Sequence, residues 1–138
     1  MSRQIGHRFP EAEFRIDPAR VEEYVTALGV EPTPGYRAVP GAEVPPGFFM
    51  YVTTYGAEQV HDELGFDMLR TVYGGTEVEM YHPVRVGDTL RVRPQITGVT
   101  EKDGRSGRLT FVELTTEYLR DDGTVVLVER SNTVQRSQ

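Results

Sequence analysis

The 138-residue sequence has no cysteine and only three histidines. Without cysteine the chain cannot form a disulfide, a zinc–thiolate site or a cysteine nucleophile, and scattered histidines alone predict no metal site. Fifteen basic against 21 acidic residues give a net charge of −6, whereas nucleic-acid-binding proteins carry a basic excess. No run of about 18 apolar residues occurs, so no membrane-spanning helix is predicted. We therefore expect neither nucleic acid nor a membrane as a partner.

The first ten residues also lack the apolar stretch of about 7–15 residues that a secretory signal requires. Together with the missing cysteines, this favours a reducing, cytoplasmic location. The length fits one domain over residues 1–138, since domains cluster at roughly 100–150 residues. A chain of this length can bury about two-thirds of its unfolded surface, so we expect it to fold without a metal or other cofactor.

The first predicted helix follows Asp17 and ends at Gly29. Asp17 can cap the helix, Pro18 suits its first position, and glycine commonly stops a helix. Four residues at helical spacing form one apolar stripe: Val21, Tyr24, Val25 and Leu28. The pattern predicts a surface helix that packs on the rest of the domain.

The segment Val30–Gly47 holds five of the nine prolines. Proline fixes φ and removes a backbone donor, so this segment is predicted to be neither helix nor central strand. Because Tyr36, Val39 and Val44 are interleaved and a helix start follows at once, we predict an ordered loop. Ordered loops of this length are often functional.

A second helix is predicted from Phe48 to about Leu64, with Gly65 in a position to stop it. Its first half is apolar on nearly every face, which predicts burial all round. Its second half is polar and contains His61 and Asp62. We expect this helix to begin deep in the domain and to exit to solvent.

The remaining chain is predicted to form an antiparallel β meander. Asp103-Gly104 and Asp122-Gly123 are hairpin signals, and Pro94 indicates an edge strand or a bulge. The predicted strands cover residues 71–81, 89–100, 108–120 and 124–135. A helix that is apolar all round requires the sheet to curl about it, which predicts an α+β fold.

Three stretches, in this order, carry a resemblance to a known family. They are the strand-and-helix opening of residues 14–28, the helix entry Pro46-Gly47-Phe48, and Tyr81–Leu90. The last is similar to the aromatic-x-Pro-Val-x-x-Gly-Asp-x-Leu turn of MaoC-like dehydratases. The chain resembles the N-terminal, non-catalytic type of domain, similar to the non-catalytic subunit of 3-hydroxyacyl-ACP dehydratases. The resemblance implies the hotdog fold, a long antiparallel sheet wrapped around a central helix.

The resemblance also implies an (R)-specific 3-hydroxyacyl-thioester dehydratase or enoyl-thioester hydratase of fatty acid metabolism. Its substrate would be carried by coenzyme A or acyl carrier protein, and no cofactor is implied. Hotdog domains typically pair edge to edge, so a homodimer or a heterodimer with a catalytic hotdog subunit is expected. The reaction needs a general base, a general acid and an N–H donor for the thioester oxygen.

The acid–base residues of the family are absent from the matching positions. Active MaoC-like hydratases share an Asp-x-Asn-Pro-x-His segment before the buried helix, whereas Glu31–Ala38 contains no asparagine and no histidine. Related fatty-acid dehydratases use a His-Phe-Pro-Gly segment and a glutamate in the helix, where this sequence has Ala38 and Val52. Neither side chain can move a proton, so no catalytic residue is predicted.

Five residues at the start of the second helix are the predicted substrate-binding residues. Amides near Gly47 and Phe48 could hold the thioester oxygen, because a helix start offers N–H donors and glycine allows close approach. The aromatic side chains could line an acyl channel, although core packing explains them equally well. The predicted set is Gly47, Phe48, Phe49, Tyr51 and Tyr55.

Two other functions stay open at this point. One is an acyl-thioester hydrolase that uses Glu58 on the helix, which Glu58→Gln would test; the other is a non-enzymatic acyl-CoA or acyl-ACP binding dimer. His61 and Asp62 fit a solvated helix end, and His82 an ordinary turn. Four arginines could contact phosphates or an acidic carrier, or simply keep the strands soluble: Arg70, Arg85, Arg91 and Arg93.

Overall fold

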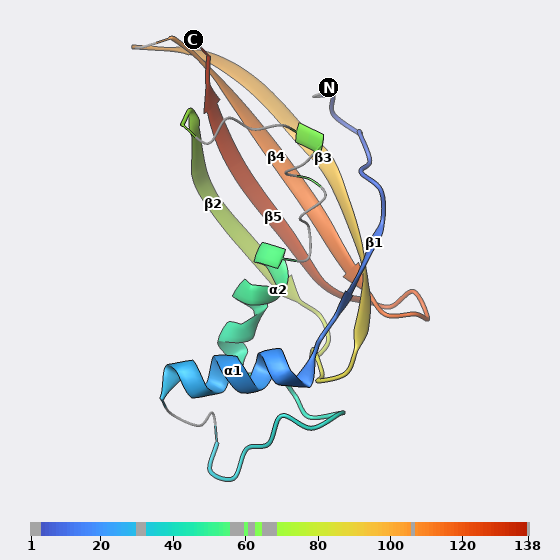
Figure 1. Cartoon of the computed structure of the whole chain (residues 1–138). Coiled ribbons are helices and arrows are strands. Elements are labelled where there is room, and N and C mark those ends of the chain that lie inside the picture. Colours follow the sequence, from blue (N-terminus) through green and yellow to red (C-terminus); the bar gives the residue numbers. More distant parts are fainter. Residues whose placement is uncertain are drawn as a thin grey trace.

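A single five-stranded antiparallel sheet, with the helices on one side of it, dominates the computed structural model (Figure 1). The structure describes residues 4–29, 33–55, 60, 63–64, 69–105 and 107–137. The strand order is β1-β3-β4-β5-β2. The strands are β1 (Ala12–Arg15), β2 (Thr71–Met80), β3 (Thr89–Gly104), β4 (Gly107–Leu119) and β5 (Val125–Arg136); the helices are α1 (Pro18–Leu28), the 3₁₀ turn η1 (Pro46–Phe48) and α2 (Phe49–Tyr55). The predicted α+β class is confirmed.

Helix α1 begins and ends as predicted. The Asp17 carboxylate accepts a hydrogen bond from the Ala19 amide (3.0 Å), and Pro18 occupies the first position. Gly29 ends the helix with a left-handed φ of 74°, a conformation that glycine adopts without steric cost. Val21 is fully buried and Tyr24 and Val25 are partly buried, so the predicted apolar stripe faces the domain except at Leu28, which is half exposed.

The meander prediction holds for β3, β4 and β5 but is wrong for β2. Strands β3 and β4 pair up to Gly104 and Gly107, and a turn at 121–123 joins β4 to β5. Strand β2 instead pairs with β5 at the far edge, with Glu77 opposite Arg130. β1 takes the place beside β3. Sequence order alone therefore does not give strand order in this sheet.

Pro94 lies neither on an edge strand nor in a bulge, in contrast to the prediction. Its strand β3 runs between β1 and β4, and the β3 bulge falls between Ile96 and Gly98. The Pro94 carbonyl accepts a hydrogen bond from the Phe9 amide (3.1 Å). In a strand, the nitrogen and the carbonyl of one residue point to the same side. The nitrogen of Pro94 therefore faces the segment around Phe9, and its missing N–H removes no hydrogen bond between β3 and β4.

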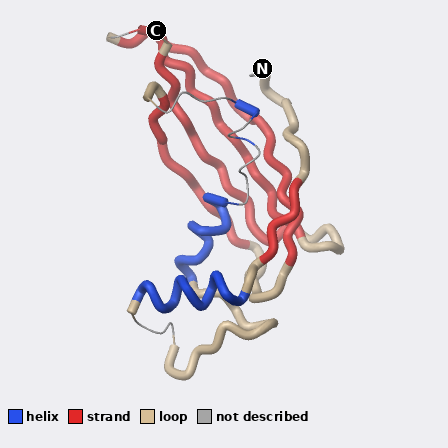
Figure 2. Tube along the Cα trace, viewed as in Figure 1, coloured by secondary structure: helices blue, strands red, loops and turns tan. Residues whose placement is uncertain are grey.

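The described part of the proline-rich loop is ordered, as predicted. Glu43 forms a bridge with Arg85, flanked by hydrogen bonds from the Val44 amide to the Val84 carbonyl (3.0 Å) and from the Val86 amide to the Ala42 carbonyl (2.8 Å). In Figure 2 this loop lies at the end of the molecule near α1. The pairing holds the residues that lead into η1 against the segment that follows β2.

Helix α2 is more exposed than predicted. Val52 is fully buried, but Met50 and Tyr55 are about half exposed, so the helix is not buried on all sides. Most of the predicted polar second half lies outside the described residues; among those described further along the chain, Val60 and Leu64 are buried and Glu63 is exposed. The apolar run of residues 48–52 thus has one face that the domain itself does not cover.

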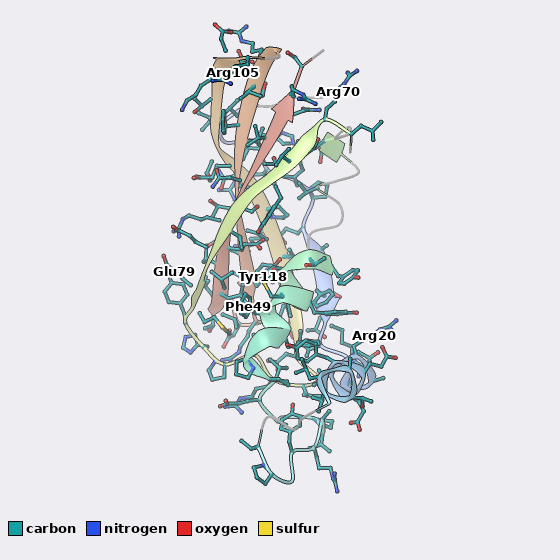
Figure 3. All side chains as sticks on the ribbon, turned by 90° about the vertical axis from the view of Figure 1, so that its left-hand side faces the viewer. Arg20, Phe49, Arg70, Glu79, Arg105 and Tyr118 are labelled. Atoms are coloured by element: carbon teal, nitrogen blue, oxygen red, sulfur yellow. The ribbon has the colours of Figure 1, made fainter. Side chains whose placement is uncertain are left out.

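Two apolar clusters pack against the same side of the sheet. The first contains Phe48, Val52 and Tyr118, and the second contains Val60 and Leu114. Figure 3, viewed onto the β2 edge, shows α2 next to β2 in front of the sheet. Within the described residues no helix combines the length and hydrophobicity that crossing a bilayer requires.

Candidate functional site

The entry to α2 is a tight turn whose backbone is already partly engaged. The Phe48 amide donates a hydrogen bond to the Pro45 carbonyl oxygen (2.9 Å), so it is not free to bind a thioester oxygen. A Cβ added to Gly47 would overlap the Tyr24 hydroxyl of α1. The space beside Gly47 is therefore occupied by the Tyr24 hydroxyl of α1. The sequence had predicted that a substrate would approach the glycine there.

The predicted aromatic residues divide between two sides of α2. Phe48 is fully buried and packs on Tyr24 (5.5 Å between ring centroids) and Tyr51 (5.0 Å, stacked). Tyr51 in turn contacts Tyr55, with centroids 4.7 Å apart. Phe49 lies on another side of the helix and lines a cavity. Substrate binding by these residues stays a prediction.

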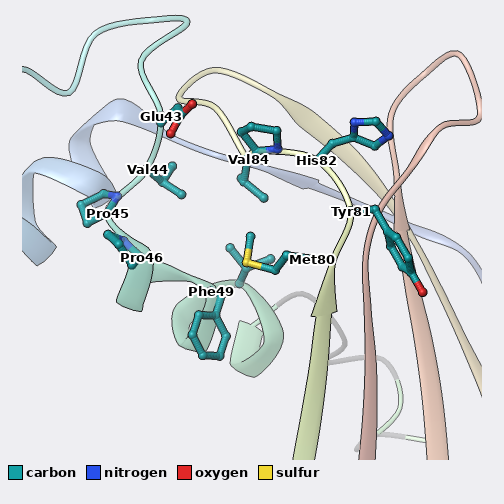
Figure 4. A pocket seen from close by; sticks show the side chains of 11 residues that line it. Glu43, Val44, Pro45, Pro46, Phe49, Met80, Tyr81, His82 and Val84 are labelled. Carbon is teal, nitrogen blue, oxygen red and sulfur yellow. The ribbon is translucent and has the colours of Figure 1, made fainter.

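The first cavity lies between the start of α2 and the end of β2 and has a volume of about 360 Å³ (Figure 4). Its inner wall is apolar and includes Val52 and Phe49. The Glu43 carboxylate and the His82 ring lie on either side of Val84 in the close-up. The lining residues are Glu43, Val44, Pro45, Pro46, Phe49, Val52, Met80, Tyr81, His82, Pro83 and Val84.

Glu43 and His82 are the acidic and histidine side chains among the residues that line the first cavity. Val52, at the position of the expected glutamate, is fully buried there, and Ala38 packs against the first apolar cluster. Glu43 is paired with Arg85 (3.7 Å), which holds its carboxylate toward the loop. His82 is exposed, and the sequence predicts an ordinary turn residue at this position. The bridge between Glu43 and Arg85 holds the loop beside the segment that follows β2, and this brings His82 to the cavity.

The second cavity lies farther along α2; most of its wall is apolar, with hydroxyl groups and one carboxyl among its lining residues. It has a volume of about 320 Å³ and is lined from α2, β2, β4 and β5. Glu129 is only 9% exposed, and its carboxylate accepts a hydrogen bond from the Thr76 hydroxyl (3.1 Å). The lining residues are Met50, Thr53, Thr54, Val60, Tyr73, Thr76, Leu114, Thr116, Glu129, Ser131 and Thr133.

Glu129 is the functional candidate that sequence reasoning missed. Burial raises the pKa of its carboxyl, because removing the charge from water disfavours the ionised form; the Thr76 hydroxyl offsets part of this effect. The signal was present in the strand pattern. Since side chains alternate in a strand, Glu129, Ser131 and Thr133 share the face of the buried Leu127.

The other predicted candidates are either outside the described residues or absent from the lining of the two cavities. Glu58, His61 and Asp62 lie outside the described residues. Arg93 is paired with Glu11 (2.5 Å), and the four predicted arginines are not among the residues that line the cavities. Across the described ranges no group of three or more acidic or histidine side chains could hold a metal ion.

Comparison with known proteins places this geometry in a family. Residues 3–129 match the family described as the FAS1-like dehydratase domain region. The chain is also similar to the C-terminally truncated HadBC (3R-hydroxyacyl-ACP dehydratase) complex from Mycobacterium tuberculosis, with a TM-score of 0.71, 18% identity, and coverage of 94% of this chain and 96% of that one. An (R)-hydratase from A. caviae involved in PHA biosynthesis gives a TM-score of 0.65 at 16% identity and 97% coverage of both chains.

A shorter match links the chain to a hydratase. Over 43 residues it is 40% identical to mesaconyl-C(4)-CoA hydratase of Chloroflexus aurantiacus, a segment that spans 31% of this chain and 15% of that protein. The ChsH1–ChsH2 complex from Mycobacterium tuberculosis shares the fold, with a TM-score of 0.67, 13% identity, and coverage of 95% and 86%. The resemblance predicted from the sequence is thereby confirmed, and the chain belongs to the FAS1-like dehydratase domain family with a MaoC-like hotdog fold.

Proposed function

We propose that this chain is an acyl-thioester-binding subunit of a hydratase or dehydratase that acts with a catalytic hotdog partner. One observation carries the proposal. The cavity at the start of α2 has the place and volume of an acyl site, but Val52 and Ala38 occupy the positions where the family's proton-transferring residues are expected. A general acid and base are required for loss or addition of water, so they must come from another chain.

The two cavities suggest how an acyl thioester binds. The first cavity is apolar within and polar at its rim, which suits an acyl chain attached to a polar carrier. The second cavity borders the neighbouring side of α2, where Met50 and Thr53 line it, and both cavities are bordered by β2. We therefore assign the thioester to the first cavity and the far part of the acyl group to the second. Coenzyme A and acyl carrier protein both fit this assignment.

The outer edge of β2 supports pairing with a second hotdog protomer. Among the described strands β2 pairs with β5 alone, which leaves its other side unpaired. Tyr73 is 61% exposed and Met80 49%, and both lie beside the exposed Met50 of α2. An exposed strand edge with apolar neighbours is a typical surface for strand pairing. A partner bound here would also border both cavities.

The activity of the purified chain tests the proposal. With crotonyl-coenzyme A as substrate we expect no hydration above the rate without enzyme, measured by loss of the enoyl absorbance. Addition of a hotdog protein that carries the Asp-x-Asn-Pro-x-His segment is expected to produce hydration. A partner variant whose histidine is replaced by alanine is the matched control. Rapid hydration by the lone chain would refute the subunit role.

Charge placed on the β2 edge should separate the protomers. For Met80→Lys we expect at least a tenfold rise in the dissociation constant, because a lysine ammonium would be buried in the interface. Sedimentation of an equimolar mixture with the catalytic partner over a dilution series measures the mass of the complex. The matched control is Leu28→Lys on α1, which is 51% exposed against 49% for Met80. If the wild-type mixture forms a complex and the Met80→Lys mixture keeps the same mass at all concentrations, this surface is excluded as the interface.

A further inference from the structure

A polar row crosses the inner face of the sheet between the two apolar clusters. On β4 the sequence along this face is Tyr118, Thr116 and Leu114, in which Tyr118 belongs to the first cluster and Leu114 to the second. Thr116 pairs with Glu129 on β5, and both are buried. The Thr116 hydroxyl and the Glu129 carboxyl therefore lie between the two apolar clusters on the inner face of the sheet.

Not all of these polar groups are satisfied within the protein. The hydroxyls of Thr133 and Tyr118 are buried and have no hydrogen-bond partner among the described residues. Thr133 lines the second cavity, and Tyr118 lies on the same face of β4 as Thr116. An unsatisfied buried polar group destabilises a fold, whereas valine in place of threonine would fill the same space. A group bound in the second cavity would give the Thr133 hydroxyl a partner.

Resting on the proposed function, we propose that the second cavity binds an uncharged hydroxyl or carbonyl oxygen of the acyl group. The hydroxyls of Thr53, Thr116 and Thr133 can both donate and accept, which complements an alcohol or a ketone. The bound thioester would then carry an oxygenated acyl chain, and a plain hydrocarbon chain of equal length would leave these groups without partners.

The charge of the lining residues excludes a carboxylate at this position. No arginine, lysine or histidine is among the described residues that line the second cavity, and its one carboxyl is that of Glu129. A second carboxylate would meet like charge with no cation to balance it. Helix α2 has seven residues and is thus about 10 Å long. The oxygen should therefore lie several bonds from the thioester in the first cavity.

Matched thioesters test the inference by isothermal titration calorimetry on the full chain. The probes are hexanoyl-coenzyme A, its 4-, 5- and 6-hydroxy derivatives, and adipoyl-coenzyme A. At least one hydroxy derivative should bind about three- to tenfold more tightly than hexanoyl-coenzyme A, the range that one additional hydrogen bond gives. Adipoyl-coenzyme A should bind more weakly than that derivative.

Two substitutions identify the cavity as the origin of the preference. Thr133→Val removes a hydroxyl that has no partner among the described residues, so the variant should fold normally and lose most of the preference. Glu129→Leu should invert the preference toward hexanoyl-coenzyme A. Thr115→Val, on the opposite face of β4, is the control and should leave it unchanged.

The outcomes separate this inference from the proposed function. Equal affinity for hexanoyl-coenzyme A and all three hydroxy derivatives would overturn the inference and leave acyl-thioester binding intact. A preference that survives Thr133→Val and Glu129→Leu would place the oxygen elsewhere and also overturn it. If no thioester binds, the proposed function itself fails, and the inference fails with it.

Discussion

Replacement of Phe48 by alanine is expected to destabilise the fold by about 3–5 kcal/mol, the usual cost of removing a large buried aromatic side chain. Phe48 is fully buried and packs on Tyr24 of α1 and Tyr51 of α2. It therefore joins the two helices at the point where α2 begins. Urea unfolding monitored by circular dichroism gives the free energy of unfolding.

Tyr55→Ala is the matched control for this substitution. Tyr55 belongs to the same aromatic row but is 49% exposed, and its contact in the row is with Tyr51. We expect a loss of about 1 kcal/mol or less. If Phe48→Ala were equally mild, Phe48 would not anchor α2, and the geometry of the first cavity would need another explanation.

Replacement of Glu129 by glutamine is expected to raise the melting temperature at neutral and alkaline pH. Burial raises the pKa of the Glu129 carboxyl, so the folded protein holds the proton more tightly than the unfolded chain does. Stability of the wild type must then fall as the pH rises from the usual glutamate pKa of about 4.3 through the higher folded value. Glutamine does not titrate, so the variant avoids this loss. Differential scanning calorimetry from pH 3 to pH 9 measures the difference.

The companion variant Thr76→Val should have the opposite effect. The Thr76 hydroxyl donates to the Glu129 carboxylate, which favours the ionised form and lowers its pKa. Without this hydroxyl the fall in stability with rising pH should become steeper. A Glu129→Gln variant whose melting temperature tracks the wild type at every pH would show that the carboxyl is not buried as described.

Local patterns in the sequence predicted most of the elements. The cap at Asp17 and the stop at Gly29 fix α1 through hydrogen bonds and conformations that neighbouring residues supply. The Asp122-Gly123 turn closes β4 onto β5, with the Gly123 amide donating to the Arg120 carbonyl (2.9 Å). Such features depend on residues a few positions apart, which is why they can be recognised without the fold.

The candidate site was predictable only in part. The segment Gly47–Tyr55 was identified from its apolar residues, and Phe49 and Val52 do line a cavity. The exposure of Met50 and Tyr55 could not be seen, because it depends on how far the sheet extends around α2. Glu129 and Thr116 come from strands that are joined by a hairpin, but Thr76 reaches Glu129 from 53 residues away.

The amino-acid sequence by itself determined where α1 begins and ends and where β4 turns into β5, and it predicts that Ala38 and Val52 replace the family's proton-transferring residues. Only the tertiary structure decided that β2 lies beside β5, which leaves the edge of β2 exposed and brings Thr76 to Glu129. The physical reason is the separation along the chain between the residues that interact. Caps, turns and alternation arise between neighbours in the chain, whereas strand order and the polarity of a cavity depend on which distant segments pack together.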